Sequence, residues 1–378
     1  MQHPVTGNPI TGNPITDSSS GKLIRFHKGR GAGSNLLDRF TAWERDTDRE
    51  FLDHLESEGE DQRRSTQVAA HPSRSIISRN ASPDLSFDQS INPYLGCEHG
   101  CTYCYARPTH AYLGLSPGLD FETRIFAKHK AAALLRSELS RTSYQPSTIA
   151  LGANTDPYQP VESRLGITRE ILEVLEECRL PVGITTKSAM VVRDADILAR
   201  MATRNLVRVY ISIGTLDTSL AARLEPRANA PSRRLEAIRR LTQQGIPVGV
   251  FTSPLIPGLN DSEMEAILKA SQQAGARFAS YVILRLPLEV RDLFVEWLEH
   301  HYPLKARRVM SLIRGMRHGK DYDSDFRVRM RGAGAYAELL AQRFRLASRR
   351  YGLNTDRTSM TVAQFIRPDK NNSQLNLF

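Results

Sequence analysis

Cysteine is scarce in this chain, with 4 residues among 378, and no apolar run approaches the roughly eighteen residues that a membrane-spanning helix needs. A disulfide framework is therefore not expected. The chain also lacks an apolar signal segment, which predicts a cytoplasmic protein whose thiols stay reduced. The length allows one large domain or two medium ones, and the hydrophobic fraction of 40% is sufficient for a core.

Acidic residues are too few to balance the basic ones, and the net charge of +10 is unevenly distributed. Residues 305–350 contain thirteen Lys or Arg and four Asp or Glu, a net charge of +9. A basic segment of this kind favours contact with DNA or RNA. A solvated helical face is the alternative, and composition alone does not decide between them.

Three of the four cysteines lie in CEHGCTYC, where Cys97, Cys101 and Cys104 are spaced C-x3-C-x2-C. Three thiolates on one short loop suit three irons of a [4Fe–4S] cluster and leave the fourth iron open for chemistry. Zinc is the alternative. It requires a fourth ligand, for which His99 and His110 are available.

This motif has an aromatic residue, Tyr103, before its last cysteine, and it lies within INPYLGCEHGCTYCYARPTHAY. It resembles the motif of the radical S-adenosylmethionine (SAM) superfamily. The resemblance implies a [4Fe–4S] cluster and SAM, cleaved reductively to a 5′-deoxyadenosyl radical, with the cofactors supplying the chemistry. It also implies an electron donor such as flavodoxin or ferredoxin. Whether SAM is consumed or regenerated stays open.

Strand and helix patterns alternate along most of the chain. Strands are expected at residues 87–94, 148–152, 182–186, 207–213, 247–252 and 278–284, and helices at 124–139, 168–178, 193–202, 231–244 and 261–274. Such alternation predicts an α/β fold built from parallel βαβ units. Six units fit the partial (β/α)6 TIM-type barrel that the resemblance implies, with the active site at the carboxyl ends of the strands.

Local signals refine the helix ends. Pro231 is expected to open one helix and Gly245 to close it. Asn260 and Glu263 predict a capping box at the start of the next. Cys178 ends an amphipathic helix and is expected to pack in the core rather than to bind metal.

Composition divides the chain into four parts. Residues 1–84 are rich in Gly, Pro, Ser and charge, and are expected to be largely disordered. Residues 85–300 form the barrel, 301–355 a basic and helical extension, and 356–378 a flexible tail. KGRGAGS, at residues 28–34, is either a linker or a phosphate or substrate contact.

Polar residues follow the strands. Asn154 and Asp156 come after the second strand, where they either make a turn or lie beside SAM, as a resemblance to the spore photoproduct lyase branch implies. Lys187 ends the third strand and could bind the SAM carboxylate or a substrate phosphate, or start a helix. Ser212 ends the fourth strand and belongs to the same candidate cofactor site.

The segment RLEPRA resembles a Glu-Pro-Arg-like segment of radical SAM relatives, which implies contacts of Glu225 and Arg227 with SAM. The spore photoproduct lyase repairs a thymine–thymine lesion with a hydrogen-donor cysteine after its second strand. Here that place falls near Ala153, with no cysteine close by. A tyrosine could donate the hydrogen instead, and the candidates are Tyr105, Tyr112 and Tyr158.

The chain ends in QLNLF, from Gln374 to Phe378, after the polar stretch DKNNS. This matches the Q-L-x-L-F peptide that bacterial DNA sliding clamps bind. A flexible tail would present the polar side chain of Gln374 and the apolar side chains of Leu375, Leu377 and Phe378 to a groove on the clamp. The alternative is that the tail docks on its own domain.

Taken together, the residues and the resemblance predict a radical SAM enzyme for nucleic-acid base repair or modification. The alternatives are radical SAM modification of a peptide or small molecule, and a non-catalytic Fe–S redox-sensing module. Salt-dependent DNA binding separates the first two, and SAM cleavage separates both from the third.

Overall fold

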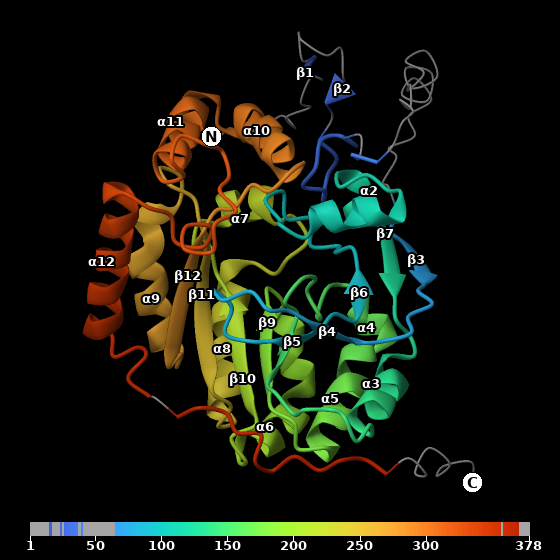
Figure 1. The fold of residues 1–378 in the computed structure, drawn as a ribbon. Helices are drawn as coiled ribbons and strands as arrows, with labels where there is room; N and C mark the ends of the chain where they lie inside the picture. Colours follow the sequence, from blue (N-terminus) through green and yellow to red (C-terminus); the bar gives the residue numbers. More distant parts are fainter. Residues whose placement is uncertain are drawn as a thin grey trace, which may run out of the picture.

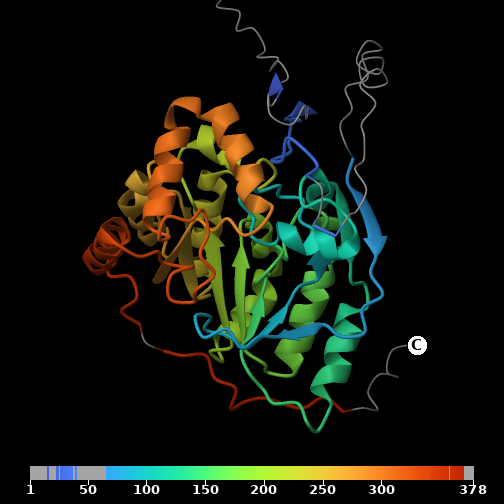
Figure 2. The same cartoon turned by 45° about the horizontal axis from the view of Figure 1, so that its top comes forward.

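The computed structural model describes residues 26–36, 39–40, 65–356 and 358–369, together with strands β1 (Ile15–Thr16) and β2 (Leu23–Ile24). The QLNLF segment lies outside the described residues. A curved sheet forms the centre, with helices covering one of its faces (Figures 1 and 2). Among the described residues no helix is both long and apolar enough to cross a membrane.

The central sheet has the order β12-β11-β10-β9-β8-β5-β4. Its six parallel strands are β5 (Gln89–Ile91), β8 (Ile149–Leu151), β9 (Val182–Thr186), β10 (Val207–Ser212), β11 (Val248–Leu255) and β12 (Phe278–Ile283). The short β4 (Ile77–Arg79) pairs antiparallel with β5 at one edge. This arrangement confirms the predicted α/β partial barrel with its parallel strands.

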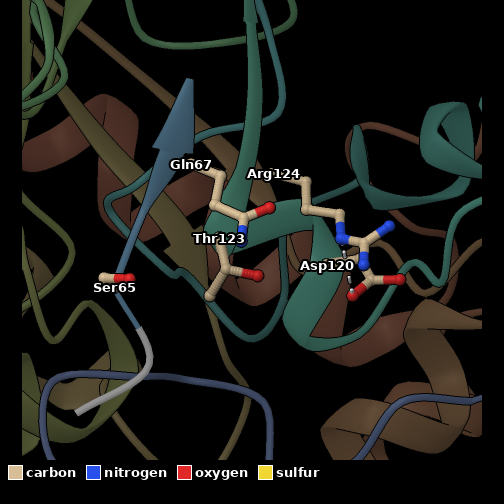
Figure 3. A pocket seen from close by; sticks show the side chains of 5 residues that line it. All are labelled: Ser65, Gln67, Asp120, Thr123 and Arg124. Carbon is tan, nitrogen blue, oxygen red and sulfur yellow. Dashed lines mark ion pairs between the residues drawn. The ribbon is translucent and has the colours of Figure 1, made fainter. Parts of the chain in front are cut away.

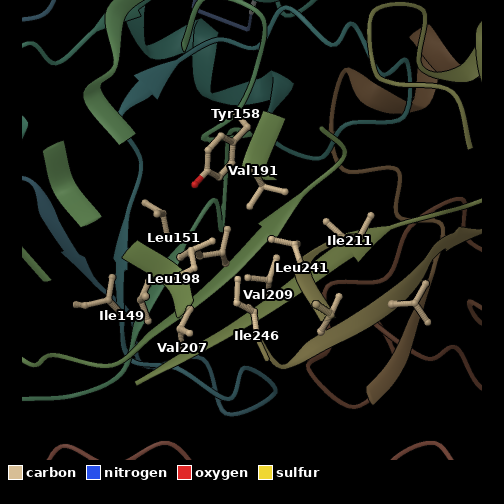
Figure 4. Close-up of a cluster of buried hydrophobic side chains, with 14 of the residues drawn as sticks. Ile149, Leu151, Tyr158, Val191, Leu198, Val207, Val209, Ile211, Leu241 and Ile246 are labelled. Atoms are coloured by element: carbon tan, nitrogen blue, oxygen red, sulfur yellow. The ribbon is translucent and has the colours of Figure 1, made fainter. Parts of the chain in front are cut away.

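The helices that alternate with these strands are α3 (Ala131–Leu139), α5 (Ile167–Glu177), α6 (Ala195–Ala202), α8 (Pro231–Gln243) and α9 (Met264–Gln273). Strand residues such as Val207 and Val209 pack with Leu198 and Leu241 in a hydrophobic core (Figure 4). As predicted, Pro231 is the first residue of α8, and Cys178, 1% exposed, belongs to this core.

Shorter elements form the loops at the carboxyl ends of the strands. They are the 3-10 turns η1 (Arg107–Leu113), η2 (Ala189–Asp194) and η3 (Asp261–Glu263), with α2 (Leu119–Thr123), α4 (Glu162–Leu165) and α7 (Thr218–Leu224). The basic extension is helical, with α11 (Pro303–Gly315) and α12 (Ala335–Arg350) following α10 (Val290–His301). Helices α10 and α11 lie above the carboxyl ends of the strands (Figures 1 and 2).

The prediction of one helix over residues 124–139 is wrong at its start. Strand β7 (Arg124–Ala127) precedes α3 and pairs with β3 (Gln67–Ala70) and β6 (Tyr94–Leu95) in a second sheet. Ile125 and Phe126 suit a strand, but their partners are remote in sequence. Strands β3 and β4 lie within residues 1–84, so a part of the segment expected to be largely disordered pairs in the two sheets.

The predicted capping box is also wrong. The Asn260 side chain accepts a hydrogen bond from the Ile256 backbone at 2.6 Å and donates one to the Gly214 carbonyl at 2.8 Å. Glu263 accepts from the Thr215 hydroxyl at 2.6 Å. Both side chains tie the loop after β11 to the loop after β10, because those two loops meet at the barrel mouth.

Candidate functional site

The cysteine loop, residues 97–104, follows β6 and precedes η1. Cys97 and Cys101 are 7% and 6% exposed, Cys104 is partly buried, and none of the three is in a disulfide. Burial raises the pKa of Cys97 well above its ordinary value, and the charges of Asp156 and the two other thiols add to this. Burial likewise raises the pKa of Cys101 to about 12. Three thiols that influence one another form a donor set suited to an iron–sulfur cluster.

Arg107, from the first position of η1, holds this loop in place. It is 0% exposed, and its Nε donates to the Cys101 carbonyl at 2.9 Å. Its Nη1 donates to the Gly118 carbonyl at 2.8 Å, and its Nη2 pairs with the Glu122 carboxylate. A buried guanidinium with acceptors on every side fixes backbone geometry, so Arg107 acts on the thiols through the main chain.

Glu122 in turn anchors the glycine-rich N-terminal segment. Its carboxylate accepts hydrogen bonds from the backbone of Gly31 at 3.0 Å and Ala32 at 2.9 Å. A Cβ on Gly31 would lie 1.7 Å from the Gly100 carbonyl oxygen, so only glycine permits this approach to the cysteine loop. The KGRGAGS segment is thus docked on the cysteine loop at Gly31 and Ala32 rather than a free linker there, and a phosphate or substrate contact by the segment stays a prediction.

A buried polar chain lies beneath the loop. The Tyr103 hydroxyl donates to Glu225, and Arg234 from α8 pairs with the same carboxylate. Arg234 also donates to the Ser212 carbonyl at 2.8 Å. Burial would raise the pKa of Glu225, but Arg234 and Lys187 hold it below its ordinary value. Sequence reasoning missed Arg234, because it lies mid-helix without a motif.

Asp156 connects the cysteine loop to the end of β9. Its carboxylate accepts from the Thr186 hydroxyl and the Lys187 backbone, both at 2.7 Å. His99 Nδ1 lies 3.3 Å from it without hydrogen-bond geometry. Burial would raise the pKa of Asp156, but His99 and these hydrogen bonds lower it to about 2. Asp156 is therefore an anion at neutral pH.

The remaining predicted cofactor residues have different surroundings. The Asn154 backbone donates to the Asn92 side chain at 2.9 Å. Arg227 forms an ion pair with Glu98 at 3.1 Å and donates to the Thr66 hydroxyl at 3.0 Å. Because Glu98 is part of the cysteine loop, Arg227 supports that loop from the side.

The three candidate tyrosines are separated by the fold. Tyr105 is 44% exposed, its hydroxyl donates to the Ala153 carbonyl, and it directly follows Cys104. Tyr158 is 0% exposed and lies in the hydrophobic core (Figure 4), so a substrate cannot reach it while the core stays closed. Tyr112 is 73% exposed, next to Phe40 at the N-terminal segment.

Two hollows lie elsewhere on the molecule. One of about 220 Å³ is lined by Ser65, Gln67, Asp120, Thr123 and Arg124, and the Arg124–Asp120 ion pair, at 3.9 Å, lies in it (Figure 3). The other, of about 780 Å³, lies between α12 and residues 331–334. Neither is lined by the cysteine loop. Within the described ranges, no three His, Cys, Asp or Glu side chains converge on a single-ion position.

Fold and site together define a partial parallel barrel with a three-cysteine loop at its mouth. Residues 91–270 match the model of the Radical SAM superfamily. The chain is 36% identical over 232 residues to Rv2578c of Mycobacterium tuberculosis, covering 61% of this chain and 68% of the relative. It is 27% identical over 214 residues to MJ0683 of Methanocaldococcus jannaschii, covering 56% and 76%.

This chain belongs to the radical SAM superfamily. It is therefore a radical SAM enzyme, and the cofactors of that family are a [4Fe–4S] cluster and SAM. Among solved structures, a spore photoproduct lyase mutant aligns with a TM-score of 0.49 at 16% identity, covering 76% of this chain and 80% of that one.

Proposed function

We propose that Cys97, Cys101 and Cys104 ligate three irons of the [4Fe–4S] cluster and that SAM binds beside them at the barrel mouth. The donor set fits, since three thiols without disulfides, two of them buried and one partly buried, come from one loop braced by Arg107. When bound, the reduced cluster and SAM supply a 5′-deoxyadenosyl radical. The protein's part is to hold both cofactors and to exclude water.

The predicted SAM residues fall into two groups: those whose charged side chains already bond to protein groups, and those that we propose to contact SAM. Glu225 and Asp156 are engaged by protein groups, and we assign them positioning roles, as we do Arg227. Lys187 lies with its Nζ 5.9 Å from the Tyr103 ring centroid. Burial would lower the pKa of Lys187, but Cys101, Glu225 and Asp156 raise it, so the ammonium is kept charged for the SAM carboxylate. Asn154 and Ser212 are proposed as neutral contacts to SAM.

The proposed substrate is a nucleic acid, for base repair or modification. The observation that carries this is a set of exposed arginines that form no ion pair within the described residues: Arg307 and Arg308 on α11, and Arg345 and Arg349 on α12. Helix α11 lies above the same carboxyl ends as the cysteine loop (Figure 2). Such side chains neutralise phosphates along a bound strand.

The first experiment is anaerobic reconstitution with iron and sulfide, followed by dithionite and SAM. We expect 5′-deoxyadenosine from the wild type and from Cys178→Ala, and none from Cys101→Ala. Cys178 is a matched control because it is also buried but lies in the core. A cluster that forms and leaves SAM intact would support the redox-sensing alternative, and retained zinc without a cluster would refute the assignment.

The substrate proposal is tested by anisotropy with a labelled oligonucleotide at several salt concentrations. The double change Arg307→Gln and Arg308→Gln should lower the slope of log affinity against log salt by about 1 to 2, as each lost phosphate contact contributes about one unit. Arg200→Gln is the control, since Arg200 is exposed but pairs with Glu176. Salt-independent or absent binding would favour a peptide or small molecule.

We further propose that QLNLF, from Gln374 to Phe378, binds a bacterial DNA sliding clamp. Deleting residues 374–378 should abolish binding to the purified sliding clamp, measured by surface plasmon resonance, while SAM cleavage persists. Unchanged clamp binding after the deletion would refute QLNLF as the binding segment, and absence of clamp binding by the wild type would refute the partner. The electron donor is proposed to be a flavodoxin or ferredoxin, which must replace dithionite in the same cleavage assay.

A further inference from the structure

Arg285 lies at the barrel mouth in an unusual environment for a partly buried cation. It comes two residues after the end of β12, and its guanidinium carbon is 5.0 Å from the ring centroid of Tyr105. Tyr105 directly follows Cys104 and is 44% exposed, while its hydroxyl is fixed on the Ala153 carbonyl. An aromatic face and a guanidinium thus lie together next to the cysteine loop.

The guanidinium of Arg285 has unused donors. Its Nε is buried without a hydrogen-bond partner, and Nη1 points at the Met330 thioether, a weak acceptor, at 3.6 Å. In the part of the chain that the structure describes, no carboxylate pairs with it. The neighbouring acid, Asp84, is already held through both oxygens by Arg329, at 2.5 and 2.6 Å.

A second buried arginine adds to this positive charge. Arg317 is 0% exposed and donates to two backbone carbonyls, those of Val328 and Leu284, without an ion pair among the described residues. Burial, and after it the charge of Arg285, lowers the pKa of Arg317 to about 10. A buried guanidinium beside a partly buried one, neither paired with a carboxylate among the described residues, is costly, and an anionic ligand would offset that cost.

We propose that Arg285 and Tyr105 form the substrate subsite beside the cysteine loop, where Arg285 pairs with a phosphodiester and Tyr105 stacks on the adjoining base. The guanidinium fork matches two phosphate oxygens, and an aromatic face accepts any base. Lys187, directly after β9, lies over the Tyr103 ring, whereas Arg285, two residues after the edge strand β12, lies over the Tyr105 ring. Within this proposal the SAM carboxylate is assigned to Lys187 and the phosphodiester to Arg285. This subsite rests on the proposed nucleic-acid function, and it specifies where the nucleic-acid strand binds at the barrel mouth.

The test uses the anaerobically reconstituted full chain with SAM, and measures anisotropy of a fluorescein-labelled trinucleotide and a 20-mer of thymidine. Arg285→Gln should weaken trinucleotide binding about tenfold and lower its salt slope by about 1. The matched control is Arg277→Gln, because Arg277 lies just before the other end of β12 and pairs with Asp356. It should stay within about twofold of wild type.

Tyr105 supplies a second pair of variants. Tyr105→Ala should weaken trinucleotide binding about tenfold, since stacking is lost, whereas Tyr105→Phe keeps the ring and should bind like the wild type. Iron content and circular dichroism establish that each variant retains its fold and cluster. Equal effects of Phe and Ala would overturn the stacking role.

The outcomes separate the subsite from the function on which it rests. If the wild type binds both oligonucleotides and Arg285→Gln binds them equally well, the subsite is refuted and the nucleic-acid function stands. If Arg285→Gln loses SAM binding in equilibrium dialysis but keeps the trinucleotide, Arg285 belongs to the SAM site instead. If the wild type binds neither oligonucleotide, the function fails and the subsite with it.

Discussion

At the scale of single residues, buried ion pairs hold the cysteine loop and the residues around it in place. Arg107, Glu122, Glu225 and Arg234 are each at most 5% exposed, and each contacts a group of opposite charge. Burial of such groups is costly, so removing one member leaves its partner uncompensated. These pairs explain how a short loop of small and polar residues stays in one conformation.

The Glu225–Arg234 pair gives a residue-scale prediction. Glu225→Gln should lower the free energy of unfolding by about 3 kcal/mol in urea titrations at pH 7, because it leaves Arg234 buried without an anion. Glu236→Gln on the same helix, where the partner Arg239 is exposed, should cost less than about 0.5 kcal/mol. Equal costs in both variants would contradict this assignment.

The sign of the pH dependence follows from the same pair. The folded-state pKa of Glu225 lies below its ordinary value, so the pair stabilises the fold at neutral pH. That contribution is lost as the pH falls through the ordinary glutamate range toward the folded pKa. The stability difference between wild type and Glu225→Gln should therefore shrink on acidification.

At the scale of elements, the sequence predicted what depends on local pattern. Strand β9 matches its predicted bounds, and the cysteine loop follows β5, the first parallel strand of the barrel, with β6 of the second sheet between them. The misses depend on contacts between remote segments. Strand β7 pairs with β3, whose residues lie 57 positions earlier in the sequence. The N-terminal segment is held by hydrogen bonds to Glu122. Arg234 and Arg285 carry no motif, and only the fold brings them to the mouth.

The docking of the N-terminal segment on the cysteine loop leads to an element-scale prediction. Gly31→Ala would drive a methyl group into the Gly100 carbonyl, so segment and loop must separate. We expect roughly 1–3 kcal/mol of destabilisation, measured by thermal unfolding, and less iron bound per chain after reconstitution. Gly315→Ala at the end of α11, where a Cβ meets open space, should change neither quantity. Wild-type iron content in Gly31→Ala would show that the segment does not support the loop.

At the scale of the whole molecule, the sheet has two edges, β4 and β12, and an ion pair joins the segments beside them. Asp84 lies between β4 and β5, while Arg329 belongs to the segment that bonds to β12 through Met330. Their side chains are 11% and 15% exposed, and the two segments lie side by side in both views (Figures 1 and 2). The pair spans the side on which the partial barrel is open. Because 245 positions separate the two residues, no local pattern could have predicted it.

The Asp84–Arg329 ion pair leads to a prediction about hydrogen exchange on the open side of the barrel. Asp84→Asn should raise hydrogen exchange in residues 80–88 and 321–331 alike, because each segment loses its hold on the other, while β9 in the centre keeps its protection. The reversed pair, Asp84→Arg with Arg329→Asp, should recover protection that either reversal alone removes, with a coupling of about 1–3 kcal/mol. If the double variant exchanges as fast as the worse single one, the ion pair does not close the barrel. If hydrogen exchange rises in only one of the two segments, the two edges of the sheet are held independently. The Asp84–Arg329 ion pair then does not control access to the interior of the barrel.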